Sequence, residues 1–180
     1  HLVLRRQRQM CIRDSSTALM MHNKLDELRK KWMKEDDWPD IVYQMQHRIG
    51  LNSGQMVTGN MGSEMRMNYT MMGDTVNLAA RLEPAAKQYG VYILVGEKVY
   101  EASNDEFAFR FLDFLSVKGK EIPVKTYELI DRKDSIDKRS IELIKTFEEG
   151  LDNYFNQKWD HAIKSFIKSI NLEDLSLIHI

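Results

Sequence analysis

The sequence has little of what would define an unusual class of protein. Only one of its 180 residues is cysteine, Cys11, so an internal disulfide framework is excluded and a reducing compartment is favoured. The formal net charge is -1, which gives no sign of a nucleic-acid partner. No apolar run approaches the roughly 20 residues of a membrane helix. We therefore expect a soluble, cytoplasmic module, although a parent protein could be anchored to a membrane upstream.

The two ends of the chain show no clean helical or strand period. The first segment, HLVLRRQRQMCIRDS, is basic and lacks the apolar core of a secretory signal. Together with the closing LSLIHI, it resembles translated sequencing-adapter sequence of the kind found at the ends of metagenomic contigs. We expect residues 1–15 and 175–180 to lie outside the fold as artefacts; the alternative is a disordered arm and a short apolar tail.

Residues 16–130 carry alternating helix and strand patterns. Leu19, Leu25, Leu28 and Trp32 recur at near-helical spacing, with Ser15 or Ser16 as a cap and an end near Pro39. The segments that follow are predicted as a β-hairpin turning at 52–54, a strand over 65–72, a helix from 76 interrupted by Pro84, a buried strand over 91–95, a short helix over 96–103, and strands over 108–117 and 124–130.

This order predicts an α+β fold, with a mostly antiparallel sheet and helices on one face. A charged linker, 131–139, then leads to an α-hairpin over 140–174 that turns near residues 156–157. The spacing of Gly150, Trp159, Ala162 and Phe166 resembles one tetratricopeptide repeat, whose small residues let two helices pack closely. The alternative is a helical hairpin that packs on the domain.

Three segments carry a more specific resemblance: HRIGLNSGQMVTGNMG, NYTMMGDTVNLAARLE and VKGK. In this order and spacing they resemble the catalytic domain of class III adenylate and guanylate cyclases, over about residues 17 to 130. The resemblance implies a ferredoxin-like cyclase fold that is truncated at its N-terminus. It also implies conversion of a nucleoside triphosphate to a 3′,5′-cyclic nucleotide and pyrophosphate.

The resemblance also implies roles for four residues. Asn77 and Arg81 are four apart and so share one side of a helix. Arg81 would stabilise charge on the α-phosphate and Asn77 would orient the ribose, which makes them the expected catalytic pair. Thr70 would read the purine edge, favouring ATP over GTP, and Lys118 would bind the triphosphate. Singly, each has a plainer explanation: a β-forming threonine, a solvated helix face or a surface turn.

Other conspicuous residues are not assigned to the site. We expect the methionines of this region to serve in the core or on a dimer face: Met65, Met67, Met71 and Met72. His47 is expected to be a strand histidine with a satisfied ring nitrogen, because nothing near it has metal-ligand spacing.

The metal ligands that the resemblance implies are not in this chain. Cyclases of this family hold Mg²⁺ or Mn²⁺ with two aspartates from segments that precede the first helix here, and neither segment is present. The early aspartates match no metal motif: Asp14, Asp26, Asp36, Asp37 and Asp40. We therefore predict no metal site in the chain, and no activity for it alone or as its own homodimer.

Three functions remain open at this point. The preferred one is a fragment of an adenylate cyclase whose parent acts as a homodimer or with a second cyclase domain. The second is a catalytically degenerate regulatory or dimerisation module. The third is a helical-repeat scaffold that binds a protein partner through its tail.

Overall fold

A computed structural model of the chain describes residues 2–63, 65–116 and 123–172. Within these ranges six helices and six strands follow one another along the chain. Their bounds are α1 (Leu2–Glu35), α2 (Asp40–Tyr43), β1 (Ile49–Leu51), β2 (Val57–Ser63), β3 (Arg66–Met72), α3 (Asp74–Tyr89), β4 (Ile93–Gly96), α4 (Glu97–Ser103), β5 (Phe107–Leu115), β6 (Val124–Arg132), α5 (Lys138–Phe155) and α6 (Trp159–Leu172).

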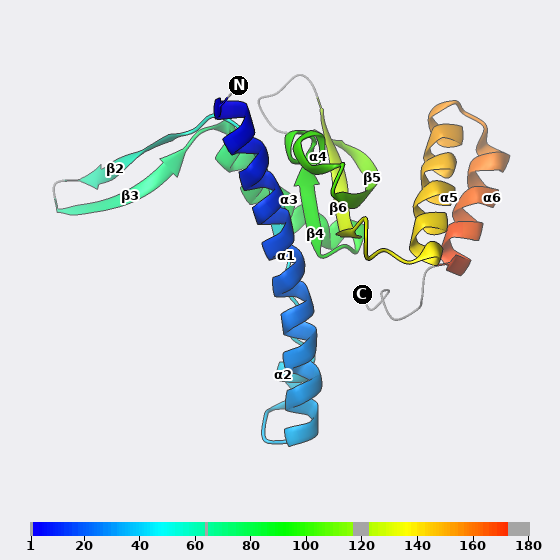
Figure 1. Ribbon diagram of the computed structural model, residues 1–180, viewed down its shortest axis with the longest axis horizontal. Coiled ribbons are helices and arrows are strands. Elements are labelled where there is room, and N and C mark those ends of the chain that lie inside the picture. The colour runs from blue at the N-terminus through cyan, green and yellow to red at the C-terminus, as the bar shows by residue number, and fades with distance from the viewer. Residues whose placement is uncertain (1, 64, 117–122, 173–180) are drawn as a thin grey trace.

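The central sheet has four strands in the order β1-β4-β6-β5. β1 and β4 are parallel, whereas β6 is antiparallel to both β4 and β5. The parallel pair is joined through α3, as a crossover connection requires. The fold is thus α+β with a mostly antiparallel sheet, as the sequence predicted (Figure 1).

Helices cover both faces of this sheet, which corrects the expectation that they lie on one face. In β4, Ile93 and Val95 pack into a core cluster beneath α1 and α4, whereas Leu94 packs on the opposite side beneath α3. All four residues of β4 are buried. A strand that is covered on both faces is apolar throughout and shows no alternation of polar and apolar residues. The sequence of β4 therefore does not indicate on which faces the helices lie.

The predicted hairpin turning at residues 52–54 is wrong. β1 pairs with β4, and β2 pairs with β3 in a separate two-stranded sheet. Adjacent strands in a sequence need not be neighbours, and here the buried β1 finds its partner across α3. Gly50 permits that arrangement, because α3 lies directly against the backbone of β1 at this residue.

Helix α1 is much longer than predicted, since it begins at Leu2 rather than near residue 15. Its buried stripe is Cys11, Ser15, Ala18 and Leu19, whose spacing places them on one side of the helix. Arg8 also forms an ion pair with Asp105, beyond α4. Residues 2–15 therefore belong to the fold. The sequence pattern did not indicate this, because the residues that pack are small and are surrounded by basic ones. Residues 175–180 lie outside the described ranges.

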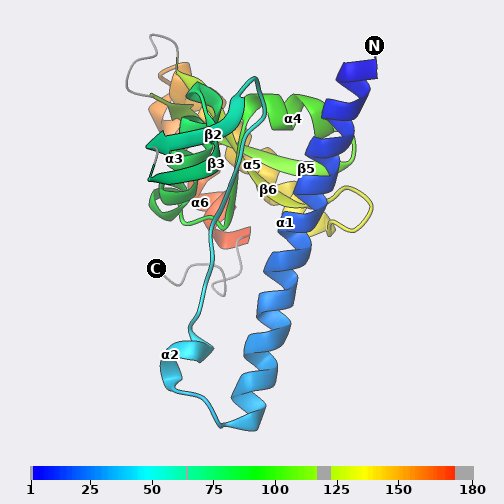
Figure 2. The ribbon, with the colours of Figure 1, turned by 90° about the vertical axis from the view of Figure 1, so that its left-hand side faces the viewer.

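Two parts of the molecule stand out from this body. The strands β2 and β3 form an arm that extends away from the sheet, and the second half of α1 extends with α2 in another direction (Figures 1 and 2). Met65, Met67, Met71 and Met72 are all exposed on the arm. They are not core residues, so only the dimer-face explanation remains open for them.

The two C-terminal helices form an antiparallel hairpin, as predicted. Gly150 of α5 is buried, and Phe166 of α6 lies over the place where a side chain would be. Phe147 reaches the core cluster under α3, and its ring lies 4.9 Å from the guanidinium of Arg110. The hairpin thus packs against the β5 side of the sheet, to the right in Figure 1.

Candidate functional site

The predicted catalytic pair lies on α3. Leu78 and Leu82 of this helix are buried against the sheet, whereas Asn77 and Arg81 are exposed. Neighbouring positions four apart share one side of a helix, so the two side chains are placed together, as predicted. Arg81 makes no ion pair or hydrogen bond with another described residue. Its charge is therefore not already neutralised within the described part of the chain.

Helix α3 begins directly after a glycine with an unusual backbone conformation. Gly73 precedes it with φ 144°, a backbone conformation that side chains rarely allow. The backbone carbonyl of Gly73 accepts hydrogen bonds from the N–H groups of Val76 and Asn77, both at 3.1 Å. At the other end, Gly90 adopts a left-handed conformation and stops the helix.

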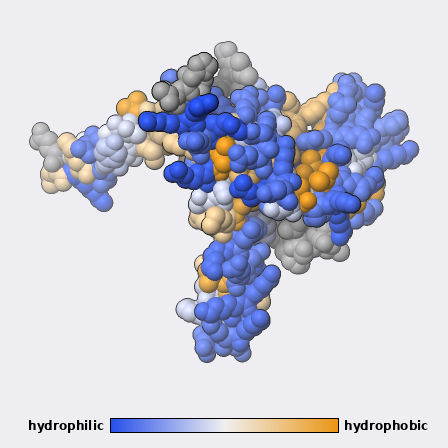
Figure 3. Space-filling view, viewed as in Figure 1, coloured by the Kyte–Doolittle hydropathy of each residue, from blue (hydrophilic) through white to orange (hydrophobic). Residues whose placement is uncertain are grey.

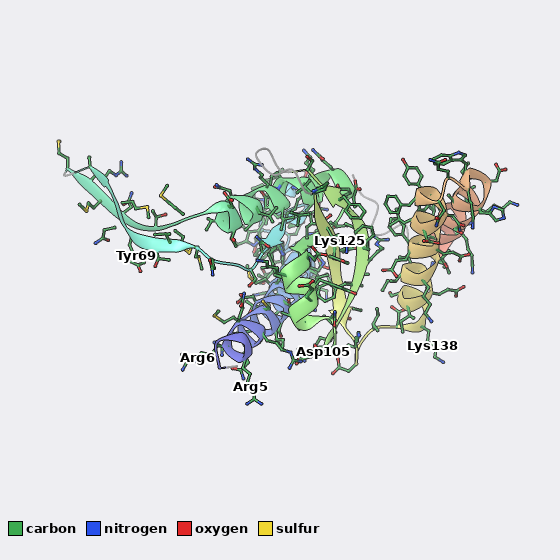
Figure 4. All side chains as sticks on the ribbon, turned by 90° about the horizontal axis from the view of Figure 1, so that it is seen from above. Arg5, Arg6, Tyr69, Asp105, Lys125 and Lys138 are labelled. Carbon is green, nitrogen blue, oxygen red and sulfur yellow. The ribbon has the colours of Figure 1, made fainter. Side chains whose placement is uncertain are left out.

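Thr70 is placed apart from the helix, on the arm. It pairs with Gly59 in the β2–β3 register and is exposed. No hydrogen bond among the described residues joins Thr70 to Asn77 or Arg81. Figure 4 shows how far the arm extends, with Tyr69 standing beside it. The structure therefore places Asn77 and Arg81 on one side of α3, whereas Thr70 lies apart from them on the arm.

Lys118 lies outside the described residues. The strands on either side of it are described, and Leu115 at the end of β5 pairs with Val124 at the start of β6. The predicted order of strand, connection and strand is therefore present around this position.

A hollow of about 1130 Å³ lies between α1 and the start of α3. Its lining comes from the first turns of α1, the loop after β1, the first turns of α3 and the start of α4. Charged side chains of both signs face it: Arg6, Asp14, Asp74 and Lys98. Thr70, Asn77 and Arg81 are not part of this lining, so the hollow neighbours the predicted site rather than containing it.

The loop beside this hollow forms side-chain hydrogen bonds with both α3 and α1. The side-chain amide of Asn52 donates a hydrogen bond to the carbonyl oxygen of Thr75 at 3.0 Å. Gln7 on α1 donates another to the hydroxyl of Ser53, also at 3.0 Å. Sequence reasoning assigned residues 52–54 to a turn and missed this role, because nothing local shows that their partners are distant in sequence.

The residues present do not fit the metal that the family implies. Among the described residues, no group of three or more His, Cys, Asp or Glu side chains could hold a metal ion. Asp14 and Asp74 both face the hollow, but Arg6 and Lys98 share its lining. Mg²⁺ prefers several oxygen ligands in near-octahedral geometry, so this donor set is poor for it.

Tyr89, at the end of α3, has a shifted pKa. Burial, reinforced by Asp113, raises the pKa of Tyr89 to about 12. The Tyr89 hydroxyl donates a hydrogen bond to Asp113 at 3.2 Å and so ties the end of α3 to β5. His47 was expected to have a satisfied ring nitrogen, but its Nε2 is buried without a hydrogen-bond partner in the described part of the chain, which corrects that expectation.

None of the described helices is both long enough and apolar enough to span a bilayer.

Solved structures with the same arrangement are nucleotide cyclases. The adenylyl cyclase CyaB from P. aeruginosa aligns over 73% of this chain and 64% of its own, with a TM-score of 0.59 and 28% identity. The guanylyl cyclase Cya2 aligns over 73% of this chain and 63% of its own, with a TM-score of 0.53 and 26% identity. The fold is therefore that of the class III nucleotidyl cyclases.

Sequence comparisons agree with the fold. A terminal-differentiation-specific adenylate cyclase of Dictyostelium discoideum is 37% identical over 123 residues, covering 66% of this chain and 6% of that protein. Adenylate cyclase 1 of Rhizobium meliloti is 39% identical over 83 residues, covering 46% of this chain and 12% of that protein. This chain thus spans a small part of these curated relatives.

The sequence model of the family described as the adenylate and guanylate cyclase catalytic domain matches residues 3–131 of this chain. The chain belongs to this family. The match begins within α1 and ends in β6, so it includes α3 with Asn77 and Arg81 but not the α5–α6 hairpin.

Proposed function

We propose that this chain is the nucleotide-contacting part of an adenylate cyclase. The observation that carries the proposal is the side of α3 on which Asn77 and Arg81 stand exposed, with Arg81 unpaired among the described residues. An unpaired guanidinium beside an amide suits a ligand that presents a phosphate next to a hydroxyl-bearing sugar.

The proposed reaction places demands that these groups meet. The 3′ oxygen of the ribose bonds to the α-phosphorus, the bond from that phosphorus to the β-phosphate oxygen breaks, and the hydroxyl proton is released. Negative charge grows on the phosphoryl oxygens as pyrophosphate leaves. Arg81 would donate to those oxygens and Asn77 would hold the ribose, so this chain contributes positioning and charge stabilisation.

We propose ATP rather than GTP as the substrate. Thr70 stands at the position implied to read the purine edge, and several relatives are named adenylate cyclases. Lys118 is proposed as a triphosphate contact on the family resemblance alone.

We propose that Mg²⁺ or Mn²⁺ is held by ligands outside this chain, so that the chain alone does not cyclise a nucleotide. The described residues offer no suitable donor set. When bound, the metal would activate the 3′ hydroxyl and neutralise phosphate charge. Residues of this chain would still bind and orient the substrate.

The proposed partner is a second cyclase domain, which in the parent is a copy of the same protein or a related domain. The arm supports this proposal, because Met65, Met67 and Tyr69 are 97%, 62% and 73% exposed. Large apolar side chains gathered on a projecting hairpin are typical of a surface that another protein covers. Figure 3 shows apolar atoms along this arm.

Complementation tests the proposal directly. This chain is mixed with a complete cyclase catalytic domain in which alanine replaces the residues corresponding to Asn77 and Arg81. The partner domain keeps its metal ligands, so the mixture should form cyclic AMP whereas neither component does so alone. Arg81→Ala in this chain should lower the rate by about 100-fold to 1,000-fold. Lys87→Ala, an exposed cation on the same helix, is the matched control and should leave the rate unchanged.

Two results would contradict the assignment. If the mixture co-elutes as a complex but makes no cyclic nucleotide, the chain is a regulatory or dimerisation module. If activity appears and Arg81→Ala does not reduce it, Arg81 is not the charge-stabilising group. Faster turnover of GTP than of ATP would contradict the assignment of Thr70.

A second role is favoured by the tail. Helix α6 carries an apolar stripe that faces solvent, formed by Trp159, Ile163, Ile167 and Ile170. We propose that a protein helix packs on this stripe, as in a tetratricopeptide repeat, where each helical hairpin needs a neighbour. Replacing Ile163 and Ile167 by aspartate should abolish binding of any cognate helical partner while leaving the cyclase complementation intact.

A further inference from the structure

The middle of α1 marks the point where this helix leaves the sheet. Its buried stripe runs through Ser15 and Ala18, reaches His22, and continues into the charged residues Asp26 and Arg29. His22 follows the fully buried residues of this stripe and is itself half-buried. The later part of α1 extends away with α2 (Figure 2).

His22 contacts rings from two other segments at this point. Its ring centroid lies 4.5 Å from that of Tyr92, which precedes β4, and 5.5 Å from that of His47, which precedes β1. Three segments that are distant in sequence thus meet through three aromatic rings. Because β1 and β4 are the parallel pair of the sheet, this cluster attaches α1 to one end of both strands.

The environment of the two histidines favours their neutral forms. The Nε2 atom of His47 is buried, and none of the residues that the structure describes forms a hydrogen bond with it. A protonated ring there would carry an N–H⁺ group without an acceptor, which is costly away from water. Protonation of both rings would also place two positive charges side by side.

Few charged groups among the described residues oppose this preference. Asp26 attracts a proton to both rings, but its carboxylate is already 3.3 Å from the guanidinium of Arg29. Arg29 itself disfavours protonation of His22 and donates a hydrogen bond to the carbonyl oxygen of Tyr43 at 2.8 Å. Burial outweighs Asp26 and lowers the pKa of both His22 and His47.

We propose that His22 and His47 form a pH-sensitive latch, which holds the middle of α1 against the sheet when both rings are neutral and releases it when they are protonated. The unfolded or released segment binds protons more readily than the packed one, so acidification favours release. The latch is closed above the ordinary histidine pKa near 6.5 and opens as the pH falls below it. This inference does not depend on the proposed catalytic role.

Nuclear magnetic resonance provides the first test on the full chain. The ring protons of His22 and His47 should titrate below the ordinary histidine pKa near 6.5. His161, which is exposed on α6, is the control position for substitution. Titration of either residue at or above about pH 6.5 would overturn the proposal, because the packed state would then not disfavour protonation.

Hydrogen exchange tests the release itself. The amide protection of α1 residues 19–30, corrected for intrinsic exchange at each pH, should fall at least about tenfold between pH 7.5 and pH 5.5, while that of α3 changes less. His22→Phe combined with His47→Met keeps apolar bulk and removes both titrations, so its α1 protection should be independent of pH. His161→Gln should behave as the wild type does.

Two outcomes of the exchange experiment would contradict the latch. Equal loss of protection in α1 and α3 would indicate general acid unfolding. A pH-dependent loss that persists in the double variant would assign the effect to other groups. If the double variant does not fold, the titration of the wild-type chain still decides the proposal.

Discussion

The carboxylate of Glu148, on α5, accepts a hydrogen bond from the backbone N–H of Phe111, on β5, at 3.4 Å. Among the described residues β5 is the last strand of the sheet, so this N–H lies on an edge where no described strand pairs with it. Phe114 on β5 also contacts Phe155 on α5, with ring centroids 5.7 Å apart. The helical hairpin thus covers an edge that would otherwise be open to pairing with another chain.

The Glu148 contact predicts a difference between two substitutions. Burial raises the pKa of Glu148. At neutral pH the charged carboxylate is therefore less favourable in the folded state than in the unfolded state. Glu148→Gln keeps a carbonyl acceptor without the charge, and should leave the free energy of unfolding at pH 7 unchanged or slightly higher. Glu148→Ala leaves the Phe111 N–H without this acceptor and should cost about 1 kcal/mol.

Urea unfolding measures both variants. Because the folded-state pKa is raised, the wild-type chain should gain stability relative to Glu148→Gln as the pH falls from 7 toward the ordinary pKa of 4.5. A wild-type advantage that instead grows with rising pH would contradict this account of Glu148.

The contact between α3 and β1 predicts that Gly50 is intolerant of any side chain. A Cβ at this position would lie 2.6 Å from the carbonyl oxygen of Ala79 and 2.7 Å from the backbone nitrogen of Glu83. Backbone atoms of a packed helix cannot move aside cheaply, so Gly50→Ala should cost about 1–3 kcal/mol or prevent folding. Gly59→Ala, on the arm where nothing lies within 4 Å, should unfold near the wild-type midpoint. Comparable losses in both variants would indicate a general effect of glycine replacement.

The helical hairpin predicts a compensating pair. A Cβ on Gly150 would lie 2.7 Å from the ring of Phe166, so Gly150→Ala should destabilise α5–α6 by about 1–3 kcal/mol despite the better helix propensity of alanine. Phe166→Leu makes room, and the double variant should be more stable than the sum of the two single effects. Thermal unfolding followed by circular dichroism measures this; strict additivity would show that the two residues do not interact.

Helix α1 predicts a stabilising substitution. The hydroxyl of Ser15 is fully buried and has no hydrogen-bond partner within residues 2–63, 65–116 and 123–172. Ser15→Ala removes that unsatisfied group at nearly constant volume and should raise the free energy of unfolding by about 1 kcal/mol. Thr17→Ala, which removes an exposed hydroxyl bonded to the carbonyl oxygen of Arg13, should change it little. A loss of stability in Ser15→Ala would mean that the hydroxyl is bonded in solution.

The sequence predicted those elements whose signals are local. The glycine that ends α3 at Gly90, the buried β4 and the two helices around Asn156 were all readable from periodicity and turn residues. The pairing of the strands could not be predicted from such local signals. The partner of β1 lies across the arm and α3, and the extra turns of α1 depend on small residues, Cys11 and Ser15, that pack only because the sheet lies beneath them.

The candidate site likewise combines local relationships with contacts between residues that are distant in sequence. Asn77 and Arg81 are fixed relative to each other by helical geometry, so a local pattern was enough to pair them. Asn52 and Gln7 hold the loop beside α3 through partners 23 and 46 residues away, and no spacing rule indicates such contacts. The orphaned ring nitrogen of His47 likewise depends on tertiary burial.

The arm gives the proposed site a mechanical property. Thr70 belongs to a hairpin without a core of its own, whereas Arg81 belongs to a helix packed on the sheet, and Gly73 joins the two. The distance between Thr70 and Arg81 is therefore not fixed by the hydrophobic core. Under the proposed roles, a partner that contacts the arm would also set the position of Thr70 relative to Arg81, and with it the purine that is selected.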